Sequence, residues 1–90
     1  MNAGEKDAQD FELIKVRTGE IIRSLRMAYG KTNAEVSSGL HMPPEWLQEV
    51  EAGRREISFA EFQSICKIFG MTAGEVMEFV SRSNKGRSLQ

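Results

Sequence analysis

The chain has 90 residues, of which 40% are apolar, and its formal net charge is −1, so we expect one small domain with a modest core. A single cysteine excludes a framework of internal disulfides, and no spacing of cysteine and histidine matches a zinc site. The polar, acidic start is unlike a signal peptide and no apolar run reaches the length of a membrane span, so we expect a cytoplasmic protein with no membrane partner.

Charge is unevenly distributed along the sequence. Residues 11–30 carry four basic and two acidic side chains, whereas residues 31–52 carry one basic and four acidic side chains. Residues 81–90 carry three basic side chains and none that is acidic. Because a nucleic-acid-binding domain is usually basic, the acidic central stretch gives no support by itself to such a function.

The first residues have too little apolar surface to offset the entropy of ordering, and we expect residues 1–9 to be disordered. Residues 11–16 fit either a short helix or an extended arm, and we treat 1–17 as a flexible or partly ordered arm. Thr18 is expected to cap the first firm helix, which runs from about Gly19 to Tyr29 and has apolar positions at helical spacing.

Three capping boxes, each a Ser or Thr followed three residues later by Glu, mark helix starts further along the chain. They are Thr32 with Glu35, Ser58 with Glu61 and Thr72 with Glu75. Three glycines mark helix ends, at positions 30, 53 and 70. These signals predict an all-α protein of five helices, in which the last helix ends near Val80 and residues 81–90 form a flexible basic tail.

The stretch from Thr32 to Glu51 predicts two short helices joined by a tight turn. The chain turns through His41, which we expect to adopt a positive φ, and Pro44 suits the first position of the second helix. Two helices this short cannot bury much surface alone, so they need the neighbouring helices as a platform. That arrangement is a helix-turn-helix, whose second helix most often enters the major groove of DNA.

Three segments carry a resemblance to the Cro/repressor type of helix-turn-helix domain, the XRE family: GEIIRSLRMAYGKT, AEVSSGLHMPPEWLQEVEAGRR and ISFAEFQSICKIFGMTAGEVMEF. The resemblance covers about Thr18 to Phe79. It implies a compact five-helix, lambda-repressor-like bundle over 18–80, a recognition helix at about 44–52, and a homodimer on a palindromic DNA operator. It also implies an ion pair between Arg26 and Glu51.

The outward face of the predicted recognition helix departs from what a DNA-binding surface usually offers. With Leu47 and Val50 facing inward, Glu45 lies at the centre of the outward face and Gln48 and Glu49 lie at its edges. The glutamates can only accept hydrogen bonds, which suits a cytosine amino group, whereas Gln48 suits adenine. Asn33 stands where the family usually has a Gln that contacts phosphate, and His41 stands where it usually has Gly.

We therefore expect a DNA-binding transcriptional regulator, with base contacts from the second helix and phosphate contacts from the start of the first helix and from the loop after the second. The expected DNA-contacting residues are Thr32, Asn33, Pro44, Glu45, Gln48, Glu49, Arg54 and Arg55. The alternative is an antiactivator or antitoxin-like module that binds a basic protein partner through the acidic face. An enzyme is not expected because no catalytic constellation is present, and no cofactor or metal is expected.

Two further side chains have alternative roles. Trp46 is expected to be half-buried against the preceding helix, with an exposed binding hot spot as the alternative. Cys66 lies on an apolar face and is expected to be a buried thiol. The sequence leaves open the operator, the sign of regulation, the effector and the dimer surface.

Overall fold

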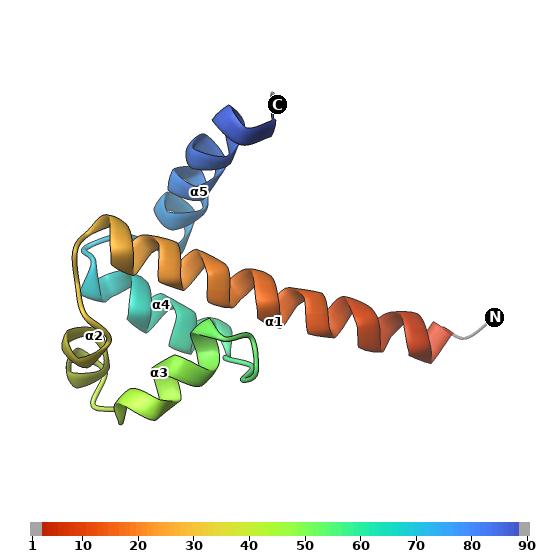
Figure 1. Ribbon diagram of the computed structural model, residues 1–90, viewed down its shortest axis with the longest axis horizontal. Coiled ribbons are helices and arrows are strands. Elements are labelled where there is room, and N and C mark those ends of the chain that lie inside the picture. The colour runs from red at the N-terminus through yellow and green to blue at the C-terminus, as the bar shows by residue number, and fades with distance from the viewer. Residues whose placement is uncertain (1–2, 89–90) are drawn as a thin grey trace. The chain divides into compact units, whose positions relative to one another are not determined.

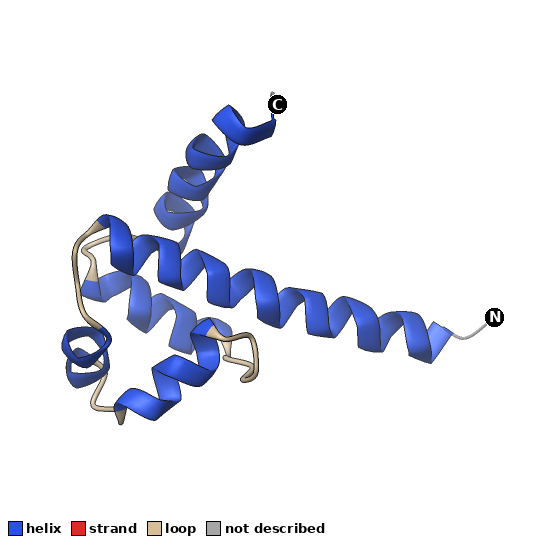
Figure 2. Cartoon of the chain, viewed as in Figure 1, coloured by secondary structure: helices blue, strands red, loops and turns tan. Residues whose placement is uncertain are grey.

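The computed structural model describes the backbone of residues 3–88 and the side chains of residues 12–82. The described backbone forms five α-helices and no strand, which confirms the all-α prediction (Figures 1 and 2). They are α1 (Ala3–Ala28), α2 (Asn33–Gly39), α3 (Pro44–Glu51), α4 (Phe59–Ile68) and α5 (Ala73–Ser88). The chain divides into two units, one containing α1–α3 and ending at Ile57, the other beginning at Ser58.

α1 is a single helix of 26 residues, so the prediction that a helix begins at Gly19 with Thr18 as its cap is wrong. The predicted disorder of residues 1–9 is also wrong for residues 3–9, while residues 1–2 lie outside the described part. From Glu5 to Thr18 the sequence has no Gly or Pro and is rich in Ala, Glu, Lys, Gln and Leu, which favour helix. Local propensity therefore carries the helix through the segment that we assigned to an arm.

The first unit has its core where α1 and α2 pack on α3. Its most deeply buried side chains, each no more than 1% exposed, are Ile22, Leu25, Val36, Ser37, Leu47 and Val50. Gly19 lies directly against the backbone carbonyls of Val50 and Glu51, where any Cβ would clash. The missing side chain at Gly19 therefore allows α1 to approach the end of α3.

The second unit consists of α4, α5 and the turn between them. Both predicted capping boxes are present, with Glu61 and Glu75 each accepting a hydrogen bond of 2.8 Å from the cap residue's backbone N–H. Ile65, Cys66 and Val76 are fully buried, which confirms the buried thiol. Burial raises the pKa of Cys66 because it disfavours the thiolate.

α5 continues to Ser88, so the predicted helix end near Val80 is wrong. Nothing in residues 81–88 stops a helix as Pro would, and Arg82 forms an ion pair of 3.7 Å with Glu78 one turn earlier. Residues 89–90 of the expected tail lie outside the described part. The division into arm 1–17, domain 18–80 and tail 81–90 stays a prediction. None of the described helices is long and apolar enough to cross a lipid bilayer.

Candidate nucleic-acid interface

The first helix of the helix-turn-helix begins with a complete capping box. The Thr32 hydroxyl oxygen accepts from the Glu35 backbone N–H at 3.1 Å, and the Glu35 carboxylate accepts from the Thr32 backbone N–H at 2.8 Å. The hydrogen bond from the Thr32 backbone is the main cause of a lowered pKa of Glu35, and the hydrogen bond with the Thr32 side chain adds to it, because both favour the carboxylate. The structure thus places Thr32 as the cap of α2, directly before Asn33.

Asn33 is oriented by a neighbour on the same helix. The Ser37 hydroxyl, buried at 1% exposure, donates to Asn33 Oδ1 at 3.0 Å. Because this bond occupies the amide oxygen, the Asn33 NH₂ group is the end that remains for other partners. An NH₂ group donates, and phosphate oxygens require donors.

The turn between α2 and α3 is closed by backbone hydrogen bonds. His41 has φ +59°, which confirms its predicted left-handed conformation. Its N–H donates to Ser38 O at 3.1 Å, and the Met42 N–H donates to Ser37 O at 2.9 Å. The turn therefore forms with a histidine where the resembling family usually has glycine, and it fixes the start of α3.

α3 presents one buried and one exposed face. Pro44 occupies its first turn as predicted, after Pro43 in an extended conformation with no side-chain cap. Leu47 and Val50 are buried as predicted, and Trp46 is only 8% exposed. Trp46 is therefore buried more deeply than the predicted half, and the exposed alternative is wrong. The exposed residues of the opposite face are Pro44, Glu45, Gln48 and Ala52.

Glu49, at the edge of this face, is bound to Arg55. Arg55 Nη2 lies 2.7 Å from Glu49 Oε1, and Arg55 Nε donates to the same oxygen at 2.9 Å. We expected Glu49 to contact bases and Arg55 to contact phosphate, but in the structure the two charges neutralise each other. Our sequence reasoning missed it because a separation of six residues is not a helical spacing. The sequence feature that could have indicated this ion pair is Gly53, because its left-handed conformation (φ +76°) turns the chain back beside the end of α3.

Glu45 and Arg54 differ from that pair. Among the described side chains, neither Glu45 nor Arg54 takes part in an ion pair. Both are exposed, and the Arg54 backbone N–H donates to Glu49 O at 2.9 Å, which fixes the loop to the end of α3. Within the described side chains, the Glu45 carboxylate at the start of α3 and the Arg54 guanidinium just after α3 are therefore available to a partner.

A partly buried ion pair holds α3 on α1. Arg26 Nε lies 2.7 Å from Glu51 Oε2 and Arg26 Nη2 donates to Glu51 Oε1 at 2.9 Å, in a bidentate arrangement. Arg26 Nη1 also donates to Lys31 O at 3.1 Å, just before α2. The hydrogen bond with Glu51 raises the pKa of Arg26. The ion pair implied by the family resemblance is confirmed, and it ties α1 both to the end of α3 and to the segment that leads into α2.

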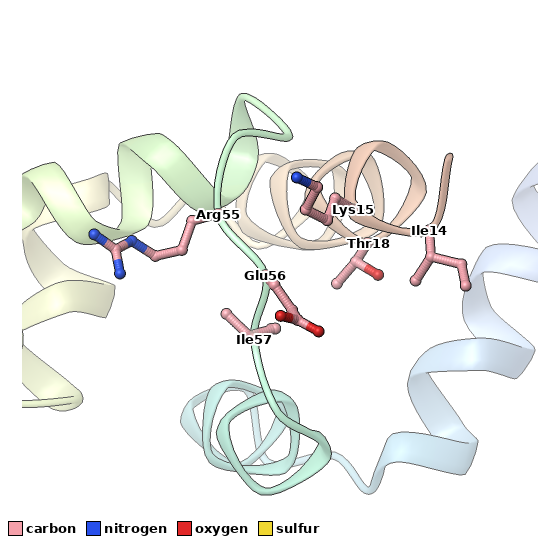
Figure 3. A pocket seen from close by; sticks show the side chains of 6 residues that line it. All are labelled: Ile14, Lys15, Thr18, Arg55, Glu56 and Ile57. Carbon is pink, nitrogen blue, oxygen red and sulfur yellow. The ribbon is translucent and has the colours of Figure 1, made fainter. Parts of the chain in front are cut away.

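A cavity of about 260 Å³ lies between α1 and the segment that follows α3 (Figure 3). Ile14, Lys15 and Thr18 line it from α1, and Arg55, Glu56 and Ile57 line it from the other side. Lys15 forms an ion pair of 2.8 Å with Glu12, and the Arg55 side chain points away from the α1 residues in Figure 3. Within the described residues, no cluster of His, Cys, Asp and Glu could hold a metal ion.

The chain is similar to two curated proteins, each named transcriptional regulator ClgR, from Mycobacterium tuberculosis strains CDC 1551 / Oshkosh and ATCC 25618 / H37Rv. Each is 35% identical over 54 residues, which are 60% of this chain and 48% of the relative. The chain thus spans about half the length of these relatives. It also resembles the crystal structure of the clp gene regulator ClgR from Corynebacterium glutamicum, with a TM-score of 0.69 and 28% identity, covering 84% of this chain and 81% of that one.

A family model described as a helix-turn-helix domain matches residues 18–79. The match includes the capping box of α2, the turn at His41, all of α3 and the Arg26–Glu51 pair. Because the family model covers more than half of the sequence, the chain belongs to the helix-turn-helix domain family.

Proposed function

We propose that this protein is a DNA-binding transcriptional regulator whose α3 enters the major groove of a double-stranded operator. The observation that carries the proposal is the exposed face of α3, held on α1 by the bidentate Arg26–Glu51 pair, in a chain of the helix-turn-helix family. A recognition helix needs this combination of an accessible outer face and a fixed inner face. The relatives named transcriptional regulators support the same role.

Base contacts come from the first half of α3. Gln48 is exposed and can donate to and accept from adenine in a bidentate arrangement. Glu45 is exposed and has no ion-pair partner among the described side chains, so it can accept from the amino group of cytosine. Pro44 adds apolar surface beside them. Glu49 holds Arg55, and we assign it to that ion pair rather than to a base.

Phosphate contacts come from both sides of α3. Asn33 offers the NH₂ group that Ser37 leaves free, next to Thr32 at the start of α2. Arg54 offers a guanidinium that forms no ion pair with any of the described side chains, whereas the charge of Arg55 is largely neutralised by Glu49. Phosphate contacts position a protein on DNA without reading its sequence. Arg54 is therefore the stronger of the two arginines as a determinant of affinity.

The partner is double-stranded DNA, bound by a homodimer, as the family resemblance implies. The polar start of the sequence favours a cytoplasmic location. A two-fold symmetric protein matches a palindromic site, because each subunit reads one half-site. The relatives named transcriptional regulators favour this function over the predicted alternative, a module that binds a basic protein. The Glu49–Arg55 pair points the same way, because it removes part of the negative charge on which that alternative depended.

The proposal is tested by selecting DNA from a random duplex library with the purified protein and comparing Gln48→Ala with the unchanged chain. We expect one enriched consensus for the unchanged chain, and about a tenfold or greater loss of preference at one base pair per half-site for Gln48→Ala. Gln63→Ala, which removes an exposed glutamine from α4, is the matched control and leaves the consensus unchanged. The absence of any enriched sequence would refute the proposal.

A further inference from the structure

The cavity between α1 and the segment that follows α3 is lined by residues of the first unit alone (Figure 3). Its volume is about 260 Å³. Because a cavity of about 150 Å³ holds benzene, this one has room for a ligand of roughly ten non-hydrogen atoms. None of the residues that line it belongs to α3, so the proposed reading of bases does not use them.

Both walls of the cavity are fixed by contacts that lie outside it. The segment after α3 is held to that helix, because the Arg54 N–H donates to Glu49 O at 2.9 Å and Arg55 forms its ion pair with Glu49. α1 is held beside the same segment, because Gly53 lies against Val16, whose Cγ2 would be 3.0 Å from an added Cβ. The cavity is therefore formed before any ligand enters, as binding sites for small molecules usually are.

The two walls offer apolar surface and one hydroxyl group. Ile14 is 62% exposed on α1, and Ile57 is partly buried on the facing segment. Thr18, also partly buried, adds its hydroxyl from α1. A ligand with an apolar body would cover the two isoleucines and gain the free energy of removing their surface from water.

The charges that line the cavity are not equally available. Lys15 forms an ion pair of 2.8 Å with Glu12, and Arg55 forms one of 2.7 Å with Glu49. Glu56 is exposed and forms no ion pair with any of the described side chains. The charge of the lining that these ion pairs leave uncompensated is therefore negative.

The direction of the side chains agrees with this difference. In Figure 3 the Arg55 side chain leaves the segment on one side, and the Glu56 side chain leaves it on the side where Ile14 lies. The Thr18 hydroxyl extends from α1 on that side as well. A carboxylate and a hydroxyl oxygen both accept hydrogen bonds, and an ammonium group has three donors.

We propose that this cavity binds a small organic cation, an ammonium group on a short apolar body. The ammonium pairs with Glu56 and donates to the Thr18 hydroxyl oxygen, and the apolar body packs between Ile14 and Ile57. The inference goes beyond the proposed function and does not depend on DNA binding. Because the cavity lies outside the exposed face of α3, the cation and an operator can occupy the same chain.

The test titrates phenethylamine, which is positively charged at neutral pH, into the isotopically labelled full chain and follows the amide chemical shifts by NMR, without DNA. We expect saturable shifts centred on residues 14–18 and 55–57, with a dissociation constant of about 10 mM or below for a compound of this size. Phenethyl alcohol, a neutral compound of the same shape, should bind about fivefold more weakly because it forms no ion pair. Phenylacetate, an anion, should bind more weakly still.

Two variants separate the ion pair from the apolar contact. Glu56→Gln keeps the shape of the side chain, so phenethylamine should lose its roughly fivefold advantage while the affinity for phenethyl alcohol stays the same. Glu20→Gln removes an exposed carboxylate of α1 outside the lining and is the matched control. Ile14→Ala should weaken both compounds by about threefold, whereas Leu13→Ala, at an exposed apolar residue outside the lining, should weaken neither.

Circular dichroism checks that each variant keeps its helix content. The inference is overturned by the absence of saturable shifts up to about 10 mM phenethylamine, or by shifts centred elsewhere. Equal affinities of the amine and the alcohol, tighter binding of phenylacetate, or an unchanged preference for the amine in Glu56→Gln would also overturn it. Because no DNA is present, none of these results bears on the proposed function.

Discussion

The two ends of α3 carry the same acidic residue in opposite settings. At the start of the helix, Glu45 is exposed and has no ion-pair partner among the described side chains. At the end, Glu49 is held by Arg55 at 2.7 Å and Glu51 by Arg26 at 2.7 Å. One end is thus free to meet a partner and the other is fixed to the scaffold. Residue type alone does not assign a role to a glutamate on a recognition helix, because its neighbours decide whether its charge is available.

The largest effect is expected where the fixed end meets α1. Arg26→Met leaves Glu51, whose side chain is 9% exposed, without its partner, so we expect the free energy of unfolding to fall by about 3 kcal/mol. Chemical denaturation at fixed protein concentration measures it. Arg82→Met is the matched control, because it breaks an ion pair whose two side chains are each 72% exposed, and it should cost less than about 1 kcal/mol. Equal losses in the two variants would contradict a structural role for the Arg26–Glu51 pair.

A smaller loss of stability is expected at the turn that returns Arg55 to α3. Gly53→Ala puts a side chain at φ +76°, which costs about 1–2 kcal/mol, and brings its Cβ within 3.0 Å of Val16. Gly30→Ala has the same left-handed conformation with nothing within 4 Å of the added Cβ, so it gives the conformational cost alone. We expect denaturation midpoints to fall for both variants and further for Gly53→Ala. A larger loss for Gly30→Ala would show that the contact with Val16 adds no strain.

The starts of α2 and α3 differ in their caps, because side chains cap the start of α2 and none caps the start of α3. The stability that the α2 cap contributes should therefore depend on pH. The pKa of Glu35 is lower in the folded state than its ordinary value of 4.5, because Thr32 hydrogen-bonds the carboxylate. A lowered folded pKa contributes stability that is fully present above pH 4.5 and is lost as the pH falls through the folded value. The stability difference between the unchanged chain and Glu35→Gln should therefore shrink below about pH 4.5. Glu56→Gln, at an exposed carboxylate outside any capping box, is the control, and a difference for Glu35→Gln that grows on acidification would contradict the sign.

Local signals were enough to predict the helix-turn-helix. The capping boxes and the positive φ of His41 depend on residues within one turn of each other, and each was found where the sequence placed it. The start of α1 and the end of α5 differ from the prediction, because these segments form helix although their sequence has no apolar periodicity. Residues of high helix propensity continue α1 before Gly19, and no Pro interrupts residues 81–88 of α5.

The ion pairs show a different limit. Arg26 and Glu51 are 25 residues apart, and only the family resemblance brought them together in advance. The pairing of Arg55 with Glu49 depends on how the chain reverses at Gly53, which neither helical periodicity nor the resemblance specified. The expected DNA contacts of both residues stay predictions, and the structure changes how we assign them.

The central claim is that the start of α3 meets DNA bases while its end is neutralised. The most direct measurement compares Glu45→Gln with Glu49→Gln in the same selection from random duplex DNA, together with the salt dependence of binding. We expect Glu45→Gln to change the preferred base at one position per half-site, because a cytosine contact is lost. Glu49→Gln should leave the consensus unchanged and steepen the logarithmic salt dependence by about one unit, because Arg55 becomes free to pair with phosphate. A changed consensus in Glu49→Gln with an unchanged one in Glu45→Gln would contradict the account.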